Sequence, residues 1–110
     1  ATIGAYHTSE VTYYFGTQDA YNMFRPTRNW TPWDRELSQK MTAVLIAFAN
    51  TGNPATADVA WPAWSATNEQ YVNFGDTIAL ETVNRARLTF MAAHRPPPMP
   101  PGGARRGPRD

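Results

Sequence analysis

The sequence predicts a small α/β fold that is mostly helical, and three patterns lead to this prediction. Residues 34–50 carry an apolar stripe with the spacing of an amphipathic helix. Residues 75–76, Gly-Asp, separate two short runs of apolar and aromatic residues, which is typical of a β-hairpin. Residues 82–93 show a second helical pattern. A chain of 110 residues provides enough core for one such domain and argues against two.

The helix at 34–50 has the clearest boundaries of the expected elements. Thr31 or Asp34 can cap its N-terminus, and Pro32 is tolerated in the first turn. Residues 51–54, Thr-Gly-Asn-Pro, end it with a glycine cap followed by a proline. The members of its apolar stripe are Leu37, Met41, Val44, Leu45 and Phe48.

Three shorter elements complete the expected structure. Residues 10–15 are apolar and aromatic and end at Gly16, so they predict one or two helical turns. The hairpin strands are expected at 71–74 and 78–80. The final helix is expected at 82–93, with four residues on one side: Val83, Ala86, Phe90 and Ala93.

The apolar run at 43–49 makes this part of the central helix apolar on nearly all sides. A helix of this kind usually packs against partners on more than one side. One further helix and one hairpin offer too little cover for it, and the chain also carries four Trp, five Tyr and five Phe. We therefore interpret the sequence as a piece of a larger fold.

A boundary is expected near residue 94. Residues 95–110 hold six of the ten prolines and carry a balance of +3, whereas residues 1–94 carry −2. The stretch at 95–110 is therefore interpreted as a solvated, disordered Pro/Arg-rich tail. Recognition by a proline-binding module or an anionic surface is the alternative for this tail. Nucleic-acid binding is not expected, because the body of the chain is mildly acidic.

Several classes of chemistry are excluded by what the sequence lacks. Without cysteine there are no disulfides and no Cys-ligated metals. The two histidines have no metal-ligand spacing, and neither a phosphate-binding loop nor a Gly-x-Ser-x-Gly elbow is present, so no metal or cofactor is expected. The longest apolar run has seven residues, which is too short to span a bilayer.

The tryptophans and the arginines of one loop have structural interpretations. Isolated aromatic residues in a small domain are usually packing residues. Arg25 and Arg28 lie in a polar loop and are interpreted as solvated charges. The tryptophans interpreted as packing residues are Trp30, Trp33, Trp61 and Trp64.

His7 is the candidate for chemistry. Gly4 precedes it, small and polar residues follow, and Glu10 opens the first apolar turn. A loop of this composition can expose an imidazole at the mouth of a cleft, where it suits general acid–base work. The alternative is a loop histidine that is hydrogen-bonded to Glu10 or to the backbone.

The surrounding residues resemble the catalytic-histidine segment of type B carboxylesterases, the family that includes cholinesterases and para-nitrobenzyl esterases. The likeness begins at 4–11, Gly-Ala-Tyr-His-Thr-Ser-Glu-Val, and at 14–16, Tyr-Phe-Gly. It continues at 48–54, Phe-Ala-Asn-Thr-Gly-Asn-Pro, at 61–64, Trp-Pro-Ala-Trp, and at 87–90. About residues 1–93 fit in the right order, and the ordered set is more specific than any one motif.

The resemblance implies the C-terminal part of an α/β-hydrolase fold at 1–94, with His7 as the triad histidine. In this fold the serine and the acid precede the histidine along the chain. They would therefore belong to an upstream part of the same fold, together with the oxyanion hole. Glu10 matches an acidic family position and is expected to support the His loop, whereas Thr8 stands where the family often has glycine.

The implied function is hydrolysis of a small carboxylic ester through an acyl-enzyme, with the 110-residue chain inactive by itself. Members of the family are frequently secreted, but the compartment of this chain stays open. The alternative is a non-catalytic, esterase-derived binding or subunit protein that uses its proline-rich basic tail.

Overall fold

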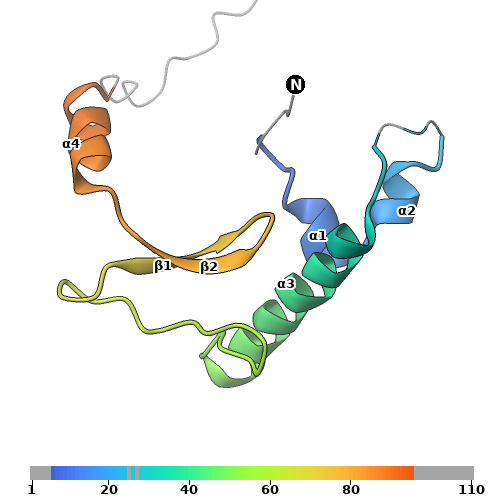
Figure 1. Cartoon of the computed structure of the whole chain (residues 1–110), viewed down its shortest axis with the longest axis horizontal. Coiled ribbons are helices and arrows are strands. Elements are labelled where there is room, and N and C mark those ends of the chain that lie inside the picture. Colours follow the sequence, from blue (N-terminus) through green and yellow to red (C-terminus); the bar gives the residue numbers. More distant parts are fainter. Residues whose placement is uncertain (1–5, 25, 27, 96–110) are drawn as a thin grey trace, which may run out of the picture.

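The computed structural model describes residues 6–24, 26 and 28–95 (Figure 1). Its elements are α1 (Val11–Phe15), α2 (Gln18–Tyr21), α3 (Pro32–Thr51), β1 (Gln70–Phe74), β2 (Ile78–Thr82) and α4 (Arg85–Ala93). Helices α1 and α2 lie near the N-terminal end of α3, and the turn of the hairpin reaches the same end. Apart from Arg95, the expected tail at 95–110 lies outside the described residues.

Helix α3 begins and ends as the sequence predicts. The Thr31 hydroxyl accepts from the Asp34 amide at 3.1 Å, and the Asp34 carboxylate accepts from the Thr31 amide at 2.8 Å. This capping box satisfies donors that the first helical turn leaves open. At the other end, Gly52 has φ +75° and its amide donates to the carbonyl of Phe48 at 2.8 Å.

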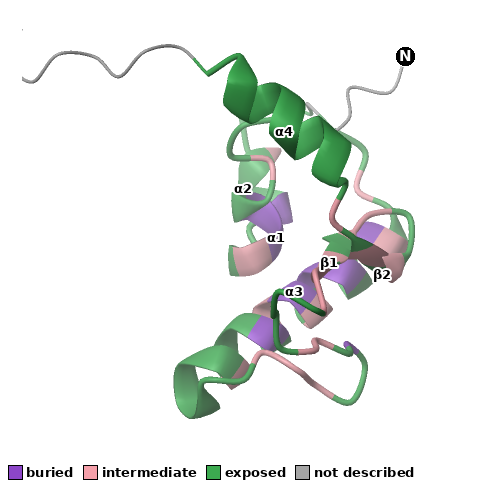
Figure 2. Ribbon diagram, turned by 90° about the vertical axis from the view of Figure 1, so that its left-hand side faces the viewer, coloured by how far each residue is buried: buried purple, intermediate pink, exposed green. Residues whose placement is uncertain are grey.

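The apolar stripe of α3 is buried along its first part only, as Figure 2 shows. Its buried members are Leu37, Met41 and Val44, which are 5%, 5% and 2% exposed. Tyr13 of α1 forms a buried hydrophobic cluster with Leu37 and Met41. Leu45 and Phe48, expected on the same stripe, are 45% and 55% exposed. The described residues thus cover one side of α3 as far as Val44 and leave most of the helix beyond it exposed.

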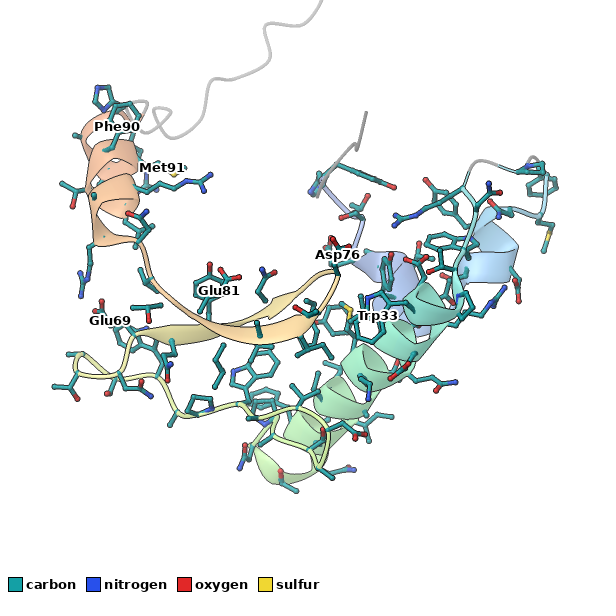
Figure 3. The ribbon with its side chains drawn as sticks, in the orientation of Figure 1. Trp33, Glu69, Asp76, Glu81, Phe90 and Met91 are labelled. Atoms are coloured by element: carbon teal, nitrogen blue, oxygen red, sulfur yellow. The ribbon has the colours of Figure 1, made fainter. Side chains whose placement is uncertain are left out.

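Strands β1 and β2 form the predicted antiparallel hairpin around Gly75. Each is one or two residues longer than expected, because the pairing continues to Gln70 and Thr82. The Trp33 indole N–H of α3 donates to the Gly75 carbonyl at 2.9 Å, and Figure 3 shows Trp33 below the Asp76 side of this turn. This hydrogen bond fixes the hairpin to the start of α3.

Helix α4 starts later than the predicted residue 82. Thr82 belongs to β2 as the partner of Gln70, and the Val83 amide extends the ladder to the Glu69 carbonyl at 2.9 Å. Asn84 then caps the helix by accepting from the Arg87 amide at 3.0 Å. The helical pattern was therefore extended wrongly into a strand. No residue of α4 is buried, and Figure 1 shows the helix apart from α1, α2 and α3.

Helix α2 has no counterpart in the sequence prediction. It spans only four residues, Gln18–Tyr21, which is too short to show an apolar period. Gln18 is nevertheless 3% exposed. Tertiary contacts rather than periodicity therefore decide this turn.

Replacing Gly52 with alanine is expected to lower the free energy of unfolding by about 1 kcal/mol, because alanine is strained at positive φ. The matched control is Gly75→Ala. Gly75 has no positive φ, and an added Cβ would meet other atoms only at 3.9 Å, so the change should stay below about 0.5 kcal/mol. Urea unfolding of the full chain measures both. Equal effects would contradict the assigned cap.

Candidate active site

His7 opens a hydrogen-bonded turn that leads directly into α1. The Ser9 amide donates to the Tyr6 carbonyl at 3.1 Å, and the Val11 amide donates to the Thr8 carbonyl at 3.2 Å. The His7 side chain is exposed. Its imidazole forms no hydrogen bond or ring contact within the part of the chain that the structure describes.

Thr8 gives this turn its sharp bend. It has a φ of +69°, in the left-handed region where glycine is usual. Its hydroxyl lies 2.5 Å from the His7 carbonyl and donates to it. The bend therefore forms with a threonine at the position where the resembling family often has glycine.

Glu10 supports the same turn through its backbone. It is the N-cap of α1, and its carbonyl accepts from the amides of Tyr13 and Tyr14 at 3.0 Å each. Its carboxylate is exposed and makes no capping hydrogen bond. Burial is the larger cause of the raised pKa of Tyr14, and the charge of Glu10 raises this pKa further. The expected side-chain action of Glu10 on His7 stays a prediction.

A polar cluster around two buried residues, Tyr13 and Asp34, joins α1 to the start of α3; we call it the Asp34 cluster. The Tyr13 hydroxyl donates to Asp34 Oδ1 at 2.6 Å and accepts from Arg28 Nη2 at 2.9 Å. The Thr31 amide and hydroxyl both donate to Asp34 Oδ2 at 2.8 Å. Tyr13 and Asp34 are each 9% exposed. The members of the Asp34 cluster are Tyr13, Arg28, Thr31 and Asp34.

The sequence analysis interpreted Arg28 as a solvated charge. Its side chain is 39% exposed, but it is also paired. Its guanidinium lies 3.5 Å from the Asp34 carboxylate and 4.6 Å from the centre of the Trp30 ring. Trp30 in turn meets Tyr13 edge-on, with ring centroids 5.8 Å apart. The guanidinium therefore compensates a buried carboxylate while it stacks on an aromatic face. Arg25 lies outside the described residues.

The tryptophans divide into packed and exposed residues. Trp30 and Trp33 pack against the buried cluster, and Trp61 contacts Phe74 with ring centroids 5.9 Å apart. These three fit the packing interpretation. Trp64 is 63% exposed, so within the described residues that interpretation is wrong for it.

The Asp34 cluster shifts the acidity of its own members. Burial first, and then the hydrogen bond to Asp34, raises the pKa of Tyr13 to about 12. Burial also acts to raise the pKa of Asp34, but the hydrogen bonds from Tyr13 and Thr31, with the charge of Arg28, outweigh it. The net pKa of Asp34 therefore lies below its ordinary value. In the folded chain, a neutral Tyr13 hydroxyl therefore donates its hydrogen bond to an ionised Asp34 carboxylate.

Two further side chains of α3 hold the end of α1. The Ser38 hydroxyl donates to the Tyr13 carbonyl at 2.6 Å, and the Thr42 hydroxyl donates to the Tyr14 carbonyl at 2.9 Å. The sequence analysis missed this pair and the Asp34 cluster. A signal was present, because Ser38 and Thr42 are four residues apart and adjoin Leu37 and Met41 on the buried stripe.

An apolar groove of about 300 Å³ lies between α1, α3 and the segment after α3. Tyr14 lines it from α1, and Leu45 and Phe48 line it from the exposed half of α3. The lining residues are Tyr14, Val44, Leu45, Phe48, Pro54 and Trp61.

The second histidine and two of the serines have local partners. His94 stacks on Phe90, with ring centroids 4.1 Å apart, and its Nδ1 lies 2.7 Å from the Phe90 carbonyl oxygen. Ser38 holds α1, and Ser65 Oγ accepts from the Asn68 amide at 3.0 Å. His7 therefore remains the candidate base of the described chain.

Two further features were sought among the described residues. No group of three His, Asp or Glu side chains there is placed to hold a metal ion. In the same ranges, no helix combines the length and the apolar content that crossing a bilayer requires.

Asp34→Asn should change how stability depends on pH. Because the folded pKa of Asp34 is lowered, its carboxylate contributes its full stabilisation above about pH 4, and this contribution is lost as the pH falls through the folded pKa. The difference in free energy of unfolding between wild type and variant should therefore shrink from pH 7 to about pH 2.5. Urea unfolding at a series of pH values measures it. Asp76→Asn, an exposed carboxylate at the hairpin turn, is the control, and an equal pH response in both variants would contradict the assignment.

The chain is similar in sequence to known esterases. The profile of the carboxylesterase family matches residues 1–91. The chain is 31% identical to the acetylcholinesterase of Bungarus fasciatus over 96 residues, and 30% identical to the para-nitrobenzyl esterase of Bacillus subtilis (strain 168) over 77 residues. These alignments cover 84% and 70% of this chain, but 15% and 16% of the two relatives.

Solved esterase structures share its fold. A structure of PNB esterase matches with a TM-score of 0.67 and 28% identity, over 78% of this chain and 18% of that chain. A thermophilic PNB esterase matches with the same TM-score and identity, over 76% of this chain and 17% of its own. The chain thus spans less than a fifth of each of these relatives.

Proposed function

Because the chain belongs to the carboxylesterase family, we propose that it supplies the catalytic histidine of a serine carboxylic-ester hydrolase, as the C-terminal part of an α/β-hydrolase fold. The observation that carries this proposal is the His7 turn. An accessible imidazole lies at the head of a hydrogen-bonded turn, and α1 ties that turn to the buried cluster. The family profile covers the same residues.

In this reaction the His7 imidazole takes the proton of a serine hydroxyl while the serine oxygen bonds to the ester carbonyl carbon. The imidazolium gives the proton to the leaving alcohol as the carbon–oxygen bond breaks, which leaves an acyl-enzyme. In the second half of the reaction, His7 takes a proton from water as the water oxygen bonds to the acyl carbon. It returns that proton to the serine oxygen as the acyl bond breaks, which releases the carboxylic acid and restores the serine. Imidazole suits both directions because it accepts and releases protons near neutral pH.

The triad serine and acid are assigned to a part of the esterase outside these 110 residues, because in this fold they precede the histidine. Two observations support such a partner. The chain spans 15% and 16% of its relatives' lengths. The C-terminal half of α3 exposes Leu45, Ile46 and Phe48 beside the apolar groove, a surface that the rest of an esterase fold would cover.

Glu10 takes a supporting role in this proposal. Its carbonyl accepts two amides at the start of α1, and its carboxylate lies at the N-terminal end of that helix, where negative charge is favourable. Removing the carboxylate should therefore slow the reaction much less than removing the imidazole. No residue of this chain is assigned to a metal or a cofactor.

A graft tests the role of His7. The segment of the Bacillus subtilis para-nitrobenzyl esterase that matches this chain is replaced by residues 1–110, and hydrolysis of p-nitrophenyl acetate is measured. The wild-type graft should be active, and His7→Ala should lower its kcat by about 10³-fold or more, because the serine loses its base. The chain alone should not accelerate hydrolysis.

His94→Ala is the matched control, since His94 is the second histidine and lies at the end of α4. This variant should keep its kcat within about twofold of the wild-type graft. A graft that unfolds cooperatively but lacks activity would contradict the proposal, as would a His7→Ala graft with full activity.

A further inference from the structure

The position of His7 depends on α1. Three residues separate His7 from Val11, the start of the helix. Backbone hydrogen bonds cross that interval: Ser9 to Tyr6, Val11 to Thr8, and Tyr13 and Tyr14 to Glu10. With Thr8 held at φ +69°, the turn has few remaining ways to bend. A displacement of α1 must therefore carry the His7 backbone with it.

The position of α1 in turn depends on Tyr13. Its side chain is 9% exposed and packs against Leu37 and Met41, its hydroxyl reaches Asp34, and its carbonyl accepts from Ser38. A helix of five residues is too short to be stable alone, so its place is set by these contacts with α3.

Asp34 fixes the geometry of the contact between α1 and α3. Oδ1 accepts from Tyr13, and Oδ2 accepts from the amide and the hydroxyl of Thr31, so both oxygens of the carboxylate are engaged. Arg28 approaches Oδ1 at 3.5 Å and compensates the charge. Apolar packing alone tolerates sliding, whereas charge-assisted hydrogen bonds to a fixed carboxylate have a required geometry. The capping box at the same residue locks the carboxylate to the start of α3.

We propose that Asp34 is a positioning residue for the catalytic base: it holds the Tyr13 hydroxyl, and through α1 it fixes where the His7 imidazole meets the serine. This role of Asp34 rests on the proposed function, in which His7 is the catalytic base. Asp34 does not touch substrate or the reacting atoms. Its loss should therefore lower the rate of each working site and leave substrate affinity almost unchanged, because small misplacements of a catalytic group lower the rate strongly.

The experiment uses the active graft with Tyr13→Phe, Asp34→Asn and the double variant, and counts working sites with an irreversible phosphonate. Each single variant should lower kcat per titrated site about 10-fold, with KM within about twofold. The double variant should be no slower than the slower single variant, because both remove one shared contact. Asp19→Asn is the control for charge removal, since Asp19 pairs with Arg35 at the exposed surface.

A merely structural role gives a different pattern. Fewer titrated sites or a lower Tm, with unchanged kcat per site, would overturn the positioning role, and so would fully additive single effects. An inactive wild-type graft would count against the proposed function instead.

If the wild-type graft is inactive, amide hydrogen exchange on the full chain tests whether the Tyr13–Asp34 contact holds the His7 turn in place. Tyr13→Phe should speed exchange of the Ser9 and Val11 amides about 10-fold and leave the Val83 amide of the hairpin unchanged. Unchanged exchange at Ser9 and Val11 would overturn the inference.

Discussion

The hydrogen bond from the Tyr13 hydroxyl to the Asp34 carboxylate is the contact on which the described structure depends. It is 2.6 Å long and links residues 21 positions apart, both 9% exposed. A carboxylate is costly to bury, and here Thr31 and Arg28 offset that cost with their own hydrogen bonds and charge. The same carboxylate caps α3, so one residue starts the long helix and orients the short one that follows His7.

Much of this architecture follows from local sequence. Pro32 and Gly52 mark the ends of α3, because proline suits the first helical turn and glycine suits the positive φ of the C-cap. Gly75 marks the hairpin turn in the sequence, although its own backbone has no positive φ. His7 was predicted as the candidate base from the composition of its loop and from the family resemblance. The structure places it in a hydrogen-bonded turn, and its catalytic role stays a prediction. The boundary of α4 was wrong because Thr82 and Val83 satisfy both a helical pattern and a strand ladder, and pairing with Gln70 and Glu69 decides between them.

The Asp34 cluster could not be read from the chain in the same way. Tyr13 and Asp34 come together only when α1 packs on α3, and no periodicity encodes a contact between a tyrosine and an arginine 15 residues apart. Arg28 accordingly looked like a solvated loop charge. The apolar run at 43–49 did carry a usable signal. It predicted partners on several sides of the helix, and Leu45, Ile46 and Phe48 are exposed, so the described residues do not supply all of those partners.

These features give one account: a carboxylesterase segment in which a buried hydroxyl–carboxylate bond sets the place of an exposed imidazole. A crystal structure of the active graft, soaked with a phosphonate that labels the serine, tests this account most directly. The account predicts the His7 Nε2 atom within about 3.2 Å of the serine Oγ, with the Tyr13–Asp34 bond retained. A serine whose base is another residue, with His7 turned to solvent, would contradict it.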